Sequence, residues 1–284
     1  MTQQSTRGGL LSVHAAALLF GGTGLFSRII DLSALDMTAM RSGIAAVVLL
    51  GVLVMTRRSL KLNSFKDTVF MAMGGVCLGL HWVTYFHAMQ VSSIAIGMIA
   101  LFTYPMITIF LEPFVTRSRP SASDVICGLA VLCGVVLMVP TFSLDSTVTQ
   151  GVMWGVLSAL LFSVRNILQR HALSVYGGEV SIFYQGSVVL LMTLLFVEHI
   201  PPLSDTMTWA QLLVLGAMFT ALPHTLFAKG LQTLKAKTVS LVACLQPVYG
   251  TLFAFVLLNE QPELMTLVGG VIIVSAATWE TYRS

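Results

Sequence analysis

Polar and aromatic side chains recur in the middle of the most apolar stretches of this sequence. His81, Trp82 and Tyr85 lie in one such stretch, and a helix would place His81 and Tyr85, four residues apart, on one face. Tyr104 and Gln246 each directly precede a proline in another apolar stretch. Polar groups are costly among apolar neighbours and therefore face a cavity or one another. The pattern predicts a solute path enclosed by apolar helices.

The predicted path residues share a position in the middle of an apolar stretch and a side chain that can stack or form hydrogen bonds. They are His81, Trp82, Tyr85, Tyr104, Asn166, His224, Gln246 and Tyr249. For each histidine, a hydrogen bond between two helices is the competing interpretation. For Trp82, the competing interpretations are packing and contact with lipid.

Four further residues are predicted hinges, namely Gly24, Pro105, Pro223 and Pro247. Proline removes one helical hydrogen bond and frees the carbonyl group four residues earlier, which could then face the path. Gly24 belongs to a glycine-rich run that permits close approach or bending. A static kink is the competing interpretation for each proline.

Charged residues in the apolar stretches are few, and Arg165 is the one that lies well inside. A guanidinium can bind a substrate carboxylate in a bidentate fork. The favoured interpretation is instead that Arg165 either extends to the nearby cytoplasmic surface or forms a structural pair. No Asp or Glu lies mid-stretch. Proton antiport therefore has no obvious carrier except the histidines, and facilitated export is the leading expectation over proton exchange.

Composition decides the class of protein that contains these residues. Of the 284 residues, 56% are apolar and 10% are charged, and the mean hydropathy is +0.88. A soluble domain has about 25% charged residues, so lipid is the expected solvent. The net charge of +3 is not a nucleic-acid signal, because the basic residues are sorted among loops. The four cysteines all lie in apolar runs without metal-site spacing.

The apolar segments fit transmembrane helices, which need about 20 apolar residues each. The ten predicted spans are 10–30, 36–56, 68–89, 92–115, 122–140, 151–172, 179–198, 207–231, 238–258 and 264–282. Because backbone groups in hydrocarbon must bond internally, each span should be helical. The predicted fold class is therefore all-α, with ten transmembrane helices.

Basic residues sort onto one side of these spans. That side carries Arg7, Arg57, Arg58, Lys61, Lys66, Arg117, Arg119, Arg170, Lys229, Lys235, Lys237 and Arg283. The other side holds Arg28, with Arg41 just inside the second span, and five acidic residues: Asp145, Glu198, Asp205, Glu260 and Glu263. Because basic loops stay in the cytoplasm, both termini are expected there, in a multi-pass protein of the inner or plasma membrane.

An internal repeat appears when the chain is shifted by 142 residues. The pairs that coincide include Arg28 with Arg170, Gln90 with Gln232, Pro105 with Pro247, and Pro120 with Pro262. All five predicted spans stay in register. The halves 1–142 and 143–284 are therefore predicted repeats of five helices, and an odd number of spans inverts the second half. The shift also places Trp82 with His224, Tyr104 with Gln246, and Gly24 with Asn166 at equal depth, facing one cavity.

Two segments carry a family resemblance. Residues 257–262 (LLNEQP) with 267–273 (LVGGVII) resemble the end of the EamA domain of the drug/metabolite transporter superfamily, and Thr103–Met106 with Leu245–Val248 resemble its mid-helix proline segments. The resemblance covers the whole chain. One departure is Arg117–Arg119, where the second repeat has Glu260. The resemblance implies export of small solutes, as in bacterial exporters of aromatic amino acids and other metabolites, through a cavity lined by the first, third and fourth helices of each repeat.

The expected function is export of amino acids, aromatic or neutral, by alternating access. The alternatives are a proton-coupled exporter of drugs or organic cations, a nucleotide-sugar carrier, and, in another class, an intramembrane lipid-modifying enzyme. The chain has no GxSxG, HExxH or P-loop motif and no paired carboxylates, so no enzyme activity, metal site or cofactor is expected. The expected partners are a small-molecule substrate and membrane lipid, without nucleic acid, and the expected oligomeric state is a monomer.

Overall fold

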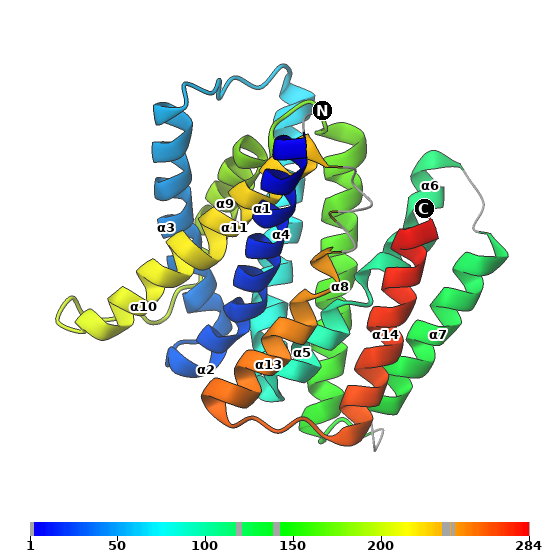
Figure 1. The fold of residues 1–284 in the computed structure, drawn as a ribbon. Helices are drawn as coiled ribbons and strands as arrows, with labels where there is room; N and C mark the ends of the chain where they lie inside the picture. Colours follow the sequence, from blue (N-terminus) through cyan, green and yellow to red (C-terminus); the bar gives the residue numbers. More distant parts are fainter. Residues whose placement is uncertain (1–2, 118–120, 139–142, 235–238, 240–241, 284) are drawn as a thin grey trace.

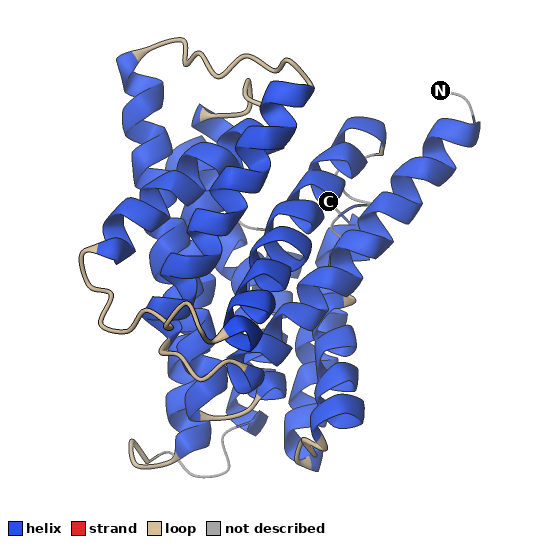
Figure 2. Ribbon diagram, turned by 90° about the vertical axis from the view of Figure 1, so that its left-hand side faces the viewer, coloured by secondary structure: helices blue, strands red, loops and turns tan. Residues whose placement is uncertain are grey.

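The computed structural model describes residues 3–117, 121–138, 143–234, 239 and 242–283. Every regular element in those ranges is a helix (Figures 1 and 2). In the first half, the elements are α1 (Gln3–Gly22), η1 (Thr23–Leu25), α2 (Phe26–Ile29), α3 (Ala34–Met55), α4 (Phe65–Val91), α5 (Ile94–Leu101), α6 (Tyr104–Thr116) and α7 (Ala122–Met138). In the second, they are α8 (Thr147–Ala172), α9 (Gly178–Leu194), α10 (Thr206–Gly216), η2 (Ala217–Ala221), α11 (Leu222–Thr233), α13 (Gln246–Leu258) and α14 (Leu264–Arg283).

Side-chain caps fix where many of these helices begin. Ser33, Ser64, Ser93 and Ser146 each accept a hydrogen bond from the backbone N–H group three residues later, at the starts of α3, α4, α5 and α8. Asp205 does the same at the start of α10. A cap satisfies one of the free N–H groups of the first turn and so marks the boundary chemically.

Apolar helical stretches among the described residues follow the order of the predicted spans. Six are long and apolar enough to cross a membrane, and they include three stretches that join consecutive elements: α1 to α2, α5 to α6, and α10 to α11. The other four are apolar helices of 10–17 residues: α7, α9, α13 and the described part of α14 up to Trp279. The all-helical, multiply spanning architecture is therefore confirmed in the described part of the chain.

Helix breaks occur at or next to the predicted hinges. The helix stops at Phe102 and Thr103 before Tyr104–Pro105, and a turn precedes Gln246–Pro247, so each proline takes a first-turn position where its missing N–H group costs nothing. Gly24 lies in the 3-10 turn η1, and Pro223 follows the π-helix η2. Whether any of them moves during transport stays a prediction.

The carbonyl group freed by Pro223 is already used. It belongs to Phe219, and it accepts a hydrogen bond of 3.3 Å from the hydroxyl group of Thr23 in η1. This carbonyl therefore joins the two halves of the chain instead of facing open space.

The two halves interlock through equivalent helices. Helix α1 packs on α11 and α13 of the second half, and α8, which the 142-residue shift makes equivalent to α1, packs on α4, α5 and α6 of the first half. Two equivalent pairs also pack directly on each other, α3 with α9 and α7 with α14. Figure 1 shows the α7–α14 pair at one edge of the bundle, and Figure 2 shows the helices running along a common direction.

The bundle has two chemically different ends. The end that carries Arg57, Arg58 and Lys61, in the loop between α3 and α4, is called the basic end, and α1 begins and α14 finishes toward it (Figure 1). The end that carries Glu260, in the loop between α13 and α14, and Asp205, before α10, is called the acidic end. The two chain ends therefore lie toward the same end of the bundle.

Replacing Gly269 by alanine is expected to destabilise the fold. A Cβ atom there would lie 2.4 Å from the carbonyl oxygen of Gly134 and 2.7 Å from Cγ of Met138, so α7 and α14 would have to move apart. Overpacking of this kind costs about 1–3 kcal/mol and should lower the thermal unfolding midpoint in detergent. The matched control is Gly51→Ala, because a Cβ atom at Gly51 meets nothing within 4 Å. Equal midpoints for the two variants would contradict the close α7–α14 contact.

Candidate functional site

Trp82 lies at the centre of a ring cluster between the two halves. It is 4% exposed, and the guanidinium carbon of Arg41, on α3, lies 4.1 Å from its ring centroid and 5.0 Å from that of Phe86. His224, on α11, approaches Trp82 at a centroid distance of 6.3 Å, and Phe20 packs edge-on against His224 at 4.8 Å. The structure thus brings Trp82 and His224, which the repeat pairs at equal depth, into contact.

His81, one residue earlier on α4, forms a reciprocal pair with Ser158 on α8. The Ser158 hydroxyl donates to the His81 carbonyl oxygen at 3.0 Å, and Nδ1 of His81 lies 2.7 Å from the same hydroxyl oxygen. Because that hydroxyl has one proton and donates it to the carbonyl, we infer that Nδ1 carries a proton and Nε2 is the acceptor. The hydrogen bond between helices, the competing interpretation for His81, is therefore present.

A file of stacked rings continues from His81 to the helix break at Tyr104. The His81 ring stacks on Phe162 at 4.6 Å and on Tyr85 at 5.9 Å. The Tyr104 ring then meets Phe162 edge-on at 5.0 Å. The backbone at the break is paired as well, because Ser163 donates to the Tyr104 carbonyl oxygen at 2.9 Å. Three predicted path residues therefore belong to one aromatic file.

Gln246 and Tyr249 lie apart from this file, where α13 crosses α1. A Cβ atom on Gly21 would lie 2.7 Å from Cβ of Tyr249 and 3.0 Å from the Gln246 carbonyl oxygen, so the two backbones nearly touch. Tyr249 packs against the apolar cluster that contains Val13. No hydrogen bond or ring contact joins Gln246 to Tyr104 in the part of the chain that the structure covers.

Arg165 anchors a chain of neutral amides. Its Nε donates to Oε1 of Gln185 at 2.8 Å, and its Nη1 donates to Oδ1 of Asn166 at 3.2 Å. Gln185 in turn donates to Gln169 at 3.1 Å, and Gln169 donates to Ser181 at 3.0 Å. Arg165 therefore makes a structural pairing, one of the two favoured interpretations, and its partners carry no charge.

Sequence reasoning missed Arg41 as a site residue. The charge pattern places it just inside the second span, whereas the residue is 2% exposed in the structure. Among the described residues it makes no hydrogen bond and no ion pair, and its buried Nε has no acceptor. The one signal in the sequence is its distance from the helix start, because Arg41 lies seven residues, or about 10 Å along the helix, after Ala34.

The electrostatics of the centre are positive. His81 interacts electrostatically with Arg41, Arg165 and His224, and His224 interacts with both arginines. No carboxylate acts on either histidine among these interactions. The nearest acidic residue along α3, Asp36, is engaged elsewhere, because it accepts from the Glu198 N–H group at 3.1 Å and from Ser33 at 2.8 Å.

An ion pair joins the two halves at the acidic end. Nη2 of Arg28 lies 3.2 Å from Oε1 of Glu260, and Nη1 also donates to the carbonyl oxygen of Gln90 at 3.1 Å. Oε2 of Glu260 accepts from the Ile94 N–H group at 2.9 Å, at the first turn of α5. The carboxylate of Glu260, which lies in the loop after α13, therefore contacts both α2 and the start of α5.

A second inter-half ion pair lies at the basic end. Oε1 of Glu112, on α6, lies 2.7 Å from Nε2 of His171 and 3.3 Å from Nη1 of Arg170, both on α8. Arg170 is the residue that the 142-residue shift pairs with Arg28. Equivalent arginines therefore make ion pairs to the other half at opposite ends of the bundle.

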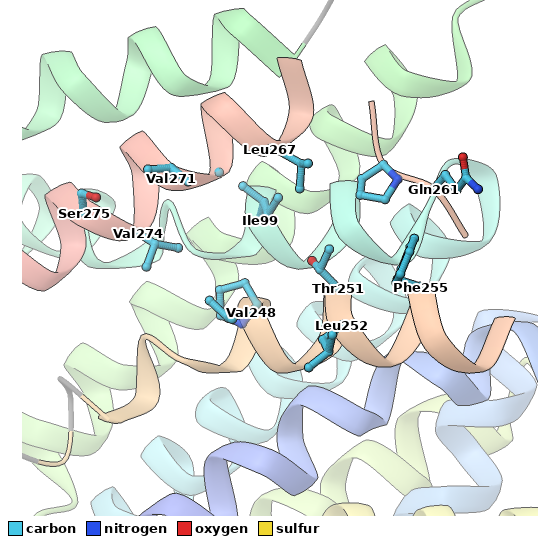
Figure 3. A pocket seen from close by; sticks show the side chains of 13 residues that line it. Ile99, Val248, Thr251, Leu252, Phe255, Gln261, Leu267, Val271, Val274 and Ser275 are labelled. Atoms are coloured by element: carbon cyan, nitrogen blue, oxygen red, sulfur yellow. The ribbon is translucent and has the colours of Figure 1, made fainter. Parts of the chain in front are cut away.

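Two cavities lie among the described helices. One, of about 620 Å³, lies between α13 and α14 with Ile99 of α5 at its floor, and its wall is almost entirely apolar (Figure 3). The other, of about 490 Å³, lies at the basic end between α3, α9 and α11, and Arg57, Arg58, Glu179 and Thr225 line it. Of the predicted path residues and hinges, only Pro247 lines either cavity. Substrate contact by any of these residues stays a prediction.

Comparisons with known proteins agree with the helical architecture. The sequence profile described as the EamA-like transporter family matches residues 7–139 and 149–279. An "uncharacterized transporter YxxF" of Bacillus subtilis (strain 168) is 24% identical over 95% of this chain and 88% of its own length. An "uncharacterized transporter" of Archaeoglobus fulgidus is 23% identical over 95% of this chain and 94% of its own. A solved crystal structure shares the fold, with a TM-score of 0.67 and 19% identity over 97% of this chain and 96% of that one.

Proposed function

The chain belongs to the EamA-like transporter family, and from this premise we propose that it is a secondary transporter that exports small metabolites, chiefly neutral and aromatic amino acids. The observation that carries the proposal is the ring cluster around Trp82 together with the adjoining His81 and its stacked rings. His81, Trp82 and His224 are polar aromatic groups held where the two halves meet, and they connect the halves without any described carboxylate among them.

The proposed architecture is ten transmembrane helices in two inverted repeats, residues 1–142 and 143–284. Two separate family matches, one in each half, support it. So do the equivalent contacts of α1 and α8 with the opposite half, and the direct pairing of α3 with α9 and α7 with α14. A two-fold axis in the membrane plane relates elements in this way, and it offers two equivalent states for alternating access.

In the proposed cycle, the two inter-half ion pairs close opposite ends of the path. The Arg28–Glu260 pair closes the acidic end, and Glu112 with Arg170 and His171 closes the basic end. The broken helices α5–α6 and α10–α11, with the start of α13, are the elements that would bend. The ring cluster, buried with both ion pairs formed, corresponds to an occluded stage of this cycle.

The proposed orientation places the basic end in the cytoplasm, in accord with the positive-inside rule. The protein would then be a monomer in the inner or plasma membrane with both termini in the cytoplasm. The cavity lined by Arg57, Arg58 and Thr225 would be its cytoplasmic entrance, since Thr225 directly follows His224 of the ring cluster.

The electrostatics favour neutral or zwitterionic solutes over organic cations. A cation exporter would be expected to hold an acid near mid-membrane, whereas the charges that reach His81 and His224 are arginines. A proton-coupled exporter of drugs or cations is therefore the second candidate. An intramembrane lipid-modifying enzyme is the candidate from another class.

Counterflow in proteoliposomes that contain only this protein tests the proposal. Vesicles preloaded with one unlabelled amino acid at a time should accumulate the labelled solute transiently, and vesicles preloaded with quaternary amines should not. Protein-free liposomes are the control. Accumulation with the amines alone would favour the second candidate. Chemical conversion of a solute or lipid in detergent, where no compartment exists, would favour the enzyme, and no accumulation with any solute would defeat the proposal.

A further inference from the structure

We propose that Arg41 binds the carboxylate group of the transported solute, and that Trp82 and Phe86 hold its guanidinium in place. The solutes carried by this protein are then small organic acids and amino acids recognised through a carboxylate. This inference rests on the proposed function, because it assigns the recognised group of the substrate at the same central site.

The first argument is the missing counter-charge. A buried charge without a partner costs several kcal/mol, and Arg41 is 2% exposed without an ion pair or hydrogen bond in the described part of the chain. The three ion pairs found there involve other residues. A leucine or methionine could occupy such a position without this cost. An arginine kept there in the free protein therefore indicates a partner that arrives from outside.

The second argument is the way in which the guanidinium is held. It lies over the Trp82 ring at 4.1 Å and near the Phe86 ring at 5.0 Å. Ring contacts of this kind orient a guanidinium through its π face and do not use its N–H groups. The planar set of donors remains for a planar acceptor, and a carboxylate matches it with two parallel hydrogen bonds.

The third argument is the surrounding charge. Arg165 is the other cation that acts on His81 and His224, and its Nε and Nη1 donate to Gln185 and Asn166. The two arginines together make the centre attractive to an anion and repulsive to a cation. Arg41 is the one of the two without acceptors, so it is the residue assigned to the carboxylate.

The test compares binding of carboxylates with binding of their primary amides, in which an uncharged carboxamide replaces the carboxylate; 3-phenylpropionate and its amide form the pair without an amino group. Purified wild-type protein and the variants R41Q, R41K and R7Q are titrated in detergent with four pairs of probes, and the thermal midpoint is followed to obtain Kd. The pairs are L-phenylalanine, L-leucine, L-serine and 3-phenylpropionate, each with its primary amide. Arg7 is exposed at the start of α1, so R7Q is the matched control.

In wild type and R7Q, at least one carboxylate should bind tenfold or more tightly than its amide. In R41Q this ratio should fall to about one, while the midpoint without ligand stays the same or rises, because an unpaired buried charge has been removed. R41K keeps the charge but not the planar donors. Its ratio of carboxylate affinity to amide affinity should therefore be at least threefold lower than that of the wild type. R41K also serves as the deciding variant if R41Q is not recovered as folded protein.

Three results would overturn the assignment: no carboxylate stabilises the wild type, amides bind as well as carboxylates, or the Arg41 variants keep the wild-type ratio. An R41Q protein with a lower midpoint and an unchanged ratio would show that Arg41 is structural. Because this readout needs no membrane, it stands apart from the counterflow test. Carboxylate binding without counterflow would defeat the proposed transport and leave the role of Arg41 intact.

Discussion

Replacing Trp82 by alanine should abolish transport and lower the free energy of unfolding by about 3–5 kcal/mol, the usual cost of removing a large buried ring. Trp82 is 4% exposed, and its ring contacts both Arg41 and His224. Its loss would open a cavity between the halves and leave the Arg41 guanidinium with the more distant Phe86 ring alone. The expected transport defect is therefore larger than the stability loss by itself would cause.

Two further variants separate these effects. Trp82→Phe keeps most of the packing but weakens the ring–cation contact, so it should recover most of the stability and only part of the counterflow rate. Trp279→Ala is the matched control, because Trp279 is 59% exposed near the end of α14. A Trp82→Ala protein that transports at the wild-type rate would remove Trp82 from the proposed site.

Arg28→Gln should shift the transporter toward a state that is open at the acidic end. The change removes the ion pair to Glu260, which joins the two halves there, and the contact with the Gln90 carbonyl oxygen within the first half. Because the side chains of Arg28 and Glu260 are 30% and 21% exposed, solvent screens the pair. We therefore expect a shift of about 1–2 kcal/mol, a factor of about 5–30 in the populations.

Alkylation of a single cysteine measures this shift. Asn166→Cys is introduced after the four native cysteines are replaced by serine, and an impermeant thiol reagent is applied from each side of the membrane. Arg28→Gln should speed alkylation from the acidic end at least fivefold. Arg170→Gln should speed it from the basic end by less, since the Arg170 side chain is already 73% exposed. The exposed Arg7→Gln is the control. Equal acceleration from both sides by Arg28→Gln would refute its closing role.

The helical architecture could be predicted from the sequence because lipid, as the solvent, permits few backbone conformations. A backbone in hydrocarbon must satisfy its own hydrogen bonds, so apolar runs of this length predict helices. Local chemistry also marked the breaks: the helices stop directly before Tyr104–Pro105 and Gln246–Pro247, as prolines in apolar runs predict. The 142-residue repeat also placed Trp82 and His224 at equal depth, and the structure shows these two rings in contact.

The neighbours of individual side chains did not follow from the sequence. Nothing near Arg41 in the chain indicates that its guanidinium lies on Trp82, and nothing near His81 points to Ser158, which is 77 residues away. The repeat paired Tyr104 with Gln246 at equal depth, yet no hydrogen bond or ring contact joins them among the described residues, because α13 crosses α1 at the Gln246 break whereas Tyr104 faces α8.

The sequence by itself determined that this chain is a helical membrane protein and that helices break before Tyr104–Pro105 and Gln246–Pro247, and it predicted which residues correspond between the halves. These features depend on local hydrogen bonding and on solvent. Only the tertiary structure decided that Arg41 is buried on a ring without a counter-ion and that Glu260 and Glu112 join the halves at opposite ends. Apolar residues occur on every side of these helices, so periodicity cannot show which face turns inward, and only packing against distant segments fixes that rotation.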